Sequence, residues 1–158
     1  MGNIFAASEI LEIGIQIERN GRDFYGVLTG EAKNPKSRKM FEYLSAEEEK
    51  HALIFQKMLD AIQKYEPTEA YPGEYFAYMR ALAAENVFTQ AVKGKEMAAK
   101  VKSDKEAINI GIGVEKDSII FYEGMKKIVP EYDQTIVDEV IAQEKDHLEK
   151  LLDLKANL

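Results

Sequence analysis

The sequence predicts an all-α protein, a four-helix bundle made of two helical hairpins that a long crossover joins. Three observations predict it. Four long stretches repeat their apolar residues at helical spacing, the two halves of the chain resemble each other, and the tract between the halves contains a shorter helical segment. The whole chain, 1–158, is expected to form one domain, because its length suffices for one sizeable core.

The composition is that of a soluble globular protein, with 46% hydrophobic and 31% charged residues. The formal net charge of −7 argues against nucleic acid or an anionic membrane as a partner. The chain contains no cysteine, which excludes disulfides and thiolate metal sites, so any metal must be held by Glu, Asp and His. No apolar run reaches the length of a membrane span, and no signal peptide is recognisable, so we expect a cytoplasmic protein.

The first hairpin is expected to consist of helices over 8–28 and 35–65. Ser8 is a candidate N-cap for the first helix. Asn34 is placed to cap the second, and Pro35 suits its first helical position. The stripe that faces the core alternates steps of three and four residues. It reads Phe41, Leu44, Glu48, His51, Phe55, Met58 and Ile62.

The crossover is expected over 66–103, with a shorter helix over about 74–90. A capping box that begins at Ser103 opens the third helix, expected over 104–128. The last helix is expected over 132–155. Its stripe reads Val137, Val140, Glu144, His147, Leu151 and Leu154.

Both histidines of the chain stand three residues after a glutamate, inside a stripe that is otherwise apolar. Positions i and i+3 share one face of a helix, so each such pair can bind one metal ion. The pairs are Glu48–His51 and Glu144–His147, and a shift of 96 residues brings the first onto the second. A shift of 97 residues aligns the first helix with the third and indicates one further acid in each half, Glu18 and Glu115.

Four inward glutamates and two histidines form the ligand set by which a four-helix bundle holds two metal ions. Four bare carboxylates in a core would each cost several kcal/mol, by order of magnitude, or would become neutral, and two divalent ions cancel their charge. In such a site Glu18 and Glu115 are expected to bridge the ions, with each Glu–His pair serving mainly one ion.

Residues around this set have less specific predicted roles. Tyr25 and Tyr122 lie two turns beyond Glu18 and Glu115, where they are candidates to hydrogen-bond a ligand or relay an electron; a plain core role is the alternative. Glu47 and Glu49 are expected to face solvent. Glycines inside helices cost about 1 kcal/mol relative to alanine, so three of them need a reason, for which close packing is preferred to space beside the metals. They are Gly14, Gly21 and Gly111.

At these residues the chain resembles the rubrerythrin-related branch of the ferritin-like superfamily. The matching segments are Glu18…Tyr25, Glu48-Glu49-Lys50-His51, Glu115…Tyr122 and Glu144-Lys145-Asp146-His147. The resemblance implies a ferritin-like bundle and a non-haem di-iron site whose ligands are Glu18, Glu48, His51, Glu115, Glu144 and His147. It also implies a reaction of Fe(II) with dioxygen or hydrogen peroxide.

Two features depart from the family. Without cysteine the chain has no cysteine-bound rubredoxin iron, so it would need an external electron donor. The family tends to carry a further carboxylate one turn past the acid of the third helix, where this chain has Ser118, and Gly21 is the matching residue of the first helix.

The leading hypothesis is an enzyme, a di-iron oxidoreductase that reacts Fe(II) with hydrogen peroxide or dioxygen in oxidative-stress or iron handling. Two iron ions would be the cofactor, with manganese or zinc also compatible, and a homodimer is expected. Two alternatives stay open. One is a non-catalytic iron-binding protein, and the other is a structural bundle whose site is empty or holds zinc.

Overall fold

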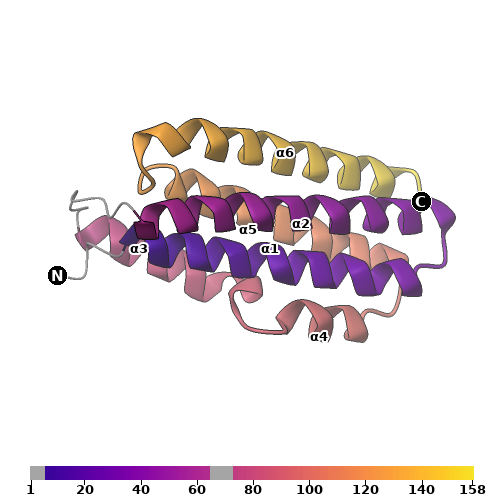
Figure 1. The fold of residues 1–158 in the computed structure, drawn as a ribbon. Coiled ribbons are helices and arrows are strands. Elements are labelled where there is room, and N and C mark those ends of the chain that lie inside the picture. The colour runs from indigo at the N-terminus through magenta and orange to yellow at the C-terminus, as the bar shows by residue number, and fades with distance from the viewer. Residues whose placement is uncertain (1–5, 65–72) are drawn as a thin grey trace.

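A computed structural model describes residues 6–64 and 73–158, and the described residues form helices and no strand (Figure 1). The α-helices are α1 (Ala6–Glu31), α2 (Pro35–Lys64), α3 (Gly73–Glu85), α4 (Lys93–Lys100), α5 (Asp104–Met125) and α6 (Glu131–Ala156), and η2 (Val87–Thr89) is a 3₁₀ helix. The predicted all-α class is therefore confirmed.

The four long helices pair as the sequence predicts. Helices α1 and α2 pack along each other as the first hairpin, and α5 and α6 form the second. Contacts between α1 and α5, and between α2 and α6, join the two hairpins into one bundle (Figure 1). All thirteen positions of the two predicted stripes are buried, so the helical spacing of apolar residues identified the core correctly.

The helix starts follow local capping chemistry. Asn34 Oδ1 accepts a hydrogen bond from Lys36 N at 2.8 Å, with Pro35 as the first residue of α2. Ser103 caps α5, because its Oγ accepts a hydrogen bond from Glu106 N at 3.1 Å. The N-cap predicted at Ser8 is wrong, since α1 already includes Ala6.

The crossover contains more helix than predicted. Helix α3 ends at Glu85, and the chain then forms η2 and a second helix, α4, that the sequence did not predict. Asn86 ends the expected helix early, because its side chain accepts a hydrogen bond from Phe88 N at 2.9 Å and caps η2 instead. The part of the predicted crossover over 65–72 lies outside the described residues.

Asn20 ties this crossover to the outer side of α1. Its Nδ2 donates to the carbonyl oxygens of Phe88 and Gln90, both at 2.6 Å, and its Oδ1 accepts from Gly94 N at 3.0 Å. Both N–H groups and the oxygen of the buried amide thus have partners, as a buried polar group requires. Helix α4 consequently lies alongside α1 (Figure 1).

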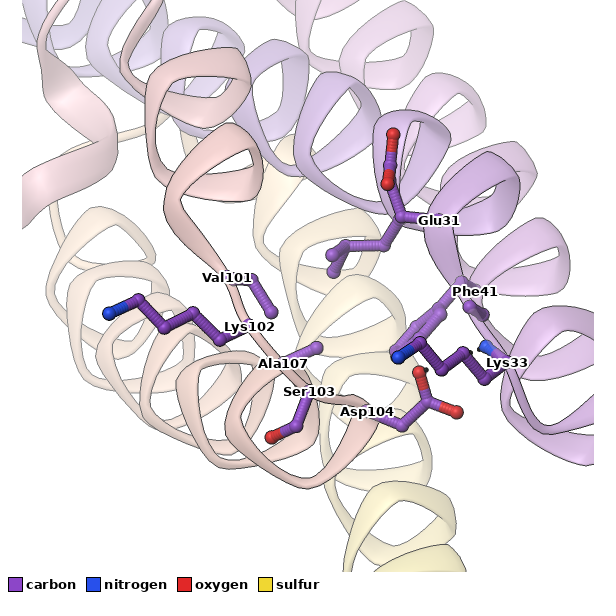
Figure 2. A pocket seen from close by; sticks show the side chains of 10 residues that line it. Glu31, Lys33, Phe41, Val101, Lys102, Ser103, Asp104 and Ala107 are labelled. Atoms are coloured by element: carbon purple, nitrogen blue, oxygen red, sulfur yellow. Dashed lines mark hydrogen bonds between the residues drawn. The ribbon is translucent and has the colours of Figure 1, made fainter.

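Asp104 joins the turn between α1 and α2 to the start of α5. Its carboxylate accepts hydrogen bonds from Lys33 N at 3.2 Å and Asn34 N at 2.8 Å. A small pocket of about 90 Å³ lies at this end of the bundle, and Figure 2 shows Asp104 and Lys33 among the side chains that line it. None of the predicted metal ligands lines it, so it is separate from the predicted site. Across the described residues, no helix is both long and apolar enough to cross a bilayer.

Candidate metal centre

The structure brings all six predicted ligand residues together inside the bundle. Helix α1 supplies Glu18 and α5 supplies Glu115, while α2 and α6 each supply a Glu–His pair. None of the six residues is more than 2% exposed. Charged or polar side chains at this depth require a hydrogen bond or an opposite charge. Because all six lie together, bound metal ions are the candidate partners.

The six residues form two overlapping groups of four, in each of which one ligand atom per residue lies within 4.8 Å of the others. The first group contains Glu18 and His51, and the second contains Glu115 and His147. Glu48 and Glu144 belong to both groups. Glu48 and Glu144 are thus the residues that the two groups share, rather than Glu18 and Glu115, which were expected to bridge.

This sharing follows from helix packing. Helices α2 and α6 contact each other, which brings the two Glu–His motifs face to face at the middle of the bundle. His51 Nδ1 lies 2.6 Å from Glu144 Oε1 of the opposite motif and 3.6 Å from Glu18 Oε1. His147 Nδ1 lies 3.8 Å from Glu48 Oε1 and 3.9 Å from Glu115 Oε2. Each histidine therefore groups with the two shared glutamates and with the remaining glutamate of its own hairpin, which is Glu18 for His51 and Glu115 for His147.

The oxygen and nitrogen atoms of the cluster are arranged to bind metal ions rather than to form hydrogen bonds with one another. Buried atoms without a hydrogen-bond partner concentrate in this cluster, and they are Glu18 Oε2, Glu48 Oε1, His51 Nδ1, Glu115 Oε2, Glu144 Oε1 and Oε2, and both ring nitrogens of His147. Even the 2.6 Å contact between His51 and Glu144 lacks hydrogen-bond geometry, since both atoms remain unpartnered. Because buried polar atoms in folded proteins are nearly always partnered, these lone pairs are arranged to coordinate cations.

The outward ring nitrogens meet two residues that the sequence reasoning did not select. His51 Nε2 lies 2.6 Å from Gln143 Oε1, and His147 Nε2 lies 3.7 Å from Glu47 Oε1. Each partner directly precedes the glutamate of the opposite motif, so the 96-residue repeat could have found both. A hydrogen bond such as that between His51 and Gln143 fixes the orientation of a ligating imidazole, whereas the His147–Glu47 contact is too long to be one. Glu47 is not the purely solvent-facing residue that was predicted, because its side chain is 15% exposed and turned toward His147.

The two tyrosines hydrogen-bond to acids across the bundle. Tyr25 Oη donates to Glu115 Oε1 at 2.9 Å, and Tyr122 Oη donates to Glu18 Oε1 at 2.6 Å. Each tyrosine therefore holds the acid of the other hairpin, which supports the predicted role as a hydrogen-bond donor to a ligand carboxylate. Burial, followed by the nearby carboxylates, raises the pKa of both phenols well above the ordinary value, so both remain protonated donors.

Two of the helical glycines make room for this cluster. A Cβ on Gly21 would lie 2.9 Å from Glu48 Oε2 and 3.2 Å from its Cδ, so Gly21 leaves the space that the carboxylate fills. A Cβ on Gly111 would lie 3.1 Å from Tyr25 Oη. At Gly14 the neighbours are Met125 and Phe55, so there the close-packing interpretation holds. For Gly21 it does not, because the neighbouring group is a predicted metal ligand.

Electrostatics in the cluster favour cations. Burial raises the pKa of Glu48 and Glu115 well above the usual range, and the neighbouring glutamates raise it further. Burial lowers the pKa of His51, but the charges of Glu18 and Glu144 outweigh it and raise the value to about 11. Burial raises the pKa of Glu144, but its contacts with Glu115 and His51 lower it overall. Protons thus compensate the negative charge here, and divalent cations can replace them.

Imidazole and carboxylate ligands in this ratio suit iron, manganese and zinc. The residue that takes the place of the family's further carboxylate, Ser118, is buried on α5, three positions past Glu115.

Comparison with known proteins gives two matches. The sequence profile of the family described as Rubrerythrin matches residues 9–155. A crystal structure from Thermotoga maritima, described as a ferritin-like diiron-carboxylate protein, shares 32% sequence identity with a TM-score of 0.69, covering 95% of this chain and 94% of the other. No curated protein matches the chain.

Proposed function

Because the chain belongs to the rubrerythrin family, we propose that it is a di-iron oxidoreductase in which hydrogen peroxide or dioxygen oxidises Fe(II). The observation that carries this proposal is the cluster of unpartnered carboxylate and imidazole atoms, arranged as two overlapping ligand groups. Four carboxylates balance the charge of two divalent ions, which matches the number of groups.

Bound iron would supply the redox chemistry, since two Fe(II) give two electrons and convert one hydrogen peroxide with two protons into two water molecules. The residues of the chain would do the rest. Glu48 and Glu144 would serve both metal positions, and the histidines would complete one position each. The two tyrosines orient Glu18 and Glu115 by hydrogen bonds. Burial of the whole cluster excludes bulk water from it.

An anaerobic Fe(II) titration followed by rapid mixing with oxidant tests the proposal. We expect two iron ions per chain and rapid loss of Fe(II) with peroxide or dioxygen. Glu48→Ala and Glu144→Ala each remove a ligand from both positions and should abolish paired binding and rapid oxidation. Glu49→Ala is the matched control, because the Glu49 carboxylate lies 2.7 Å from Arg22 Nη1 and outside the cluster.

Three results separate the alternatives. Fewer than one iron per chain, or unchanged oxidation in Glu48→Ala and Glu144→Ala, would contradict the assignment. Two bound irons without turnover by either oxidant would indicate an iron-binding protein rather than an enzyme. Zinc in protein purified without added metal would indicate a structural site, because zinc does not change oxidation state.

A further inference from the structure

A groove of about 330 Å³ opens on the side of the bundle where α2 and α6 meet. It is lined by Lys36, Lys39, Met40, Tyr43 and Lys150. We propose that this lysine groove is the docking surface for a small acidic electron-carrier protein, and that Tyr43 conducts its electrons to His147. This inference rests on the proposed di-iron function and concerns how that centre is reduced.

Tyr43 connects the surface to the buried centre. Tyr43 is 39% exposed, whereas His147 is fully buried. The two rings meet edge to face, with centroids 5.8 Å apart at 86°. Tyr43 Oη also donates a hydrogen bond to Glu47 Oε1 at 3.3 Å, and that oxygen lies 3.7 Å from His147 Nε2. Because electron transfer slows steeply with distance, a half-exposed ring in contact with a ligand histidine is a suitable entry point.

The charge of the groove is opposite to that of the chain as a whole. The chain carries a net charge of −7, yet three lysines surround Tyr43. Within the described part of the chain, Lys36 and Lys39 have no ion-pair partner. Lys150 pairs with Asp146, and its ammonium also lies 5.2 Å from the centre of the Tyr43 ring. A local positive field on an acidic protein orients an acidic partner toward this one face.

The partner must carry the electrons, because the chain has no cysteine with which to hold an iron–sulfur or rubredoxin-type centre of its own. In the proposed step the reduced carrier loses one electron per encounter, and one Fe(III) becomes Fe(II). Two encounters therefore restore the two Fe(II) that one molecule of oxidant consumes.

The test uses reduced flavodoxin, an acidic one-electron carrier, mixed anaerobically with the iron-loaded, oxidised protein. The loss of ferric absorbance is followed by stopped flow at increasing ionic strength. We expect reduction to slow as salt rises, and the K36E/K39E/K150E variant to be slower by about tenfold or more at low salt. The variant K57E/K95E/K100E is the control, because it makes the same charge change at exposed lysines outside the groove.

Tyr43 variants test the route separately from docking. Tyr43→Leu removes the ring and should slow reduction while its salt dependence persists, whereas Tyr43→Phe keeps the ring and should retain most of the rate. Iron content is measured for every variant, so that a damaged site is recognised without reference to activity.

Dithionite, which needs no docking surface, distinguishes the two proposals. Equal dithionite reduction in all variants, together with slow flavodoxin reduction in the lysine variant, would support the groove. A rate with flavodoxin that neither salt nor the lysine substitutions change would overturn the groove but leave the di-iron proposal intact. Failure of dithionite to reduce the wild-type centre would instead contradict the proposed function.

Discussion

Single residues decide how far the site could be predicted from sequence. Glu48, His51, Glu144 and His147 were found because polar residues occupy core positions of an apolar stripe, and Glu18 was found through the repeat. The sharing of Glu48 and Glu144 between the two ligand groups could not be found in that way. Periodicity gives the face of a helix but not the depth at which facing helices meet, and the contact of α2 with α6 decides which acids the two groups share.

Gly21 gives a sharp prediction at this scale. Gly21→Ala places a methyl group 2.9 Å from Glu48 Oε2 and 3.2 Å from Glu48 Cδ, so the carboxylate must turn away from the position it shares between the two groups. We expect weaker binding of both metal ions, by about tenfold or more, with the helix itself intact. A titration with Mn(II) or Fe(II) measures this loss.

Gly113→Ala is the control for that substitution, because no atom lies within 4 Å of a Cβ at Gly113. Alanine there should leave metal binding unchanged and stabilise the protein by up to about 1 kcal/mol through its higher helix propensity. Equal metal affinity in Gly21→Ala and the wild type would contradict this prediction, because the added methyl group would then not displace the Glu48 carboxylate.

At the scale of elements, the four long helices were predictable and the crossover was not. Each long helix repeats apolar residues over many turns, and its ends carry recognised capping residues such as Asn34 and Ser103. Helix α4 has only eight residues, too few for a clear period. It is held by hydrogen bonds between Asn20 and the backbone of a segment about 70 positions away, and no local pattern reveals such contacts.

Two neighbouring substitutions in this segment should have opposite effects on stability. Val92 has φ 55°, a left-handed conformation that a β-branched residue rarely adopts. Val92→Gly relieves this strain and should stabilise the protein by about 1 kcal/mol, or about 2–4 °C in Tm. Gly94→Ala should destabilise it, because the new Cβ would lie 2.0 Å from the carbonyl oxygen of Asn20, a backbone atom that cannot turn aside.

Thermal unfolding of metal-free protein measures both effects, since α4 lies outside the metal cluster. A fall in Tm for Val92→Gly, or an unchanged Tm for Gly94→Ala, would mean that α4 does not pack on α1 as described. Metal binding serves as the control, and neither variant should alter the number of ions bound.

At the scale of the whole molecule, the buried cluster makes stability a function of both pH and metal. Folding places four carboxylates and two imidazoles in one core, where they could hold metal ions but oppose the folding of the metal-free chain. The same residues therefore lower the free energy of unfolding of the metal-free protein. Replacing one of them with a neutral isostere should raise it.

The sign of the pH dependence follows from the pKa shifts. The folded-state pKa values of Glu48 and Glu115 are raised well above the ordinary 4.5, and that of His51 is raised from 6.5 to about 11. Between pH 7 and 9 folded His51 thus keeps a proton that the unfolded chain has released, and the raised pKa values of the two carboxyl groups act in the same direction. Stability of the metal-free protein must therefore fall as pH rises through this window. The lowered pKa of His147 has its effect below 6.5, so it does not oppose this trend.

Metal binding should show the opposite trend. Divalent ions displace the protons held by Glu48, Glu115 and His51, so affinity rises with pH and binding releases protons. We expect the Tm of the chelator-treated protein to decrease from pH 7 to 9, while the increase in Tm caused by saturating Mn(II) grows over the same range. Glu48→Gln removes one raised group, so it should make the metal-free protein more stable at pH 9 and flatten its pH dependence, and it should also weaken metal binding. A metal-free Tm that rises from pH 7 to 9 would contradict the protonated cluster, because only groups that release protons on folding can produce that slope.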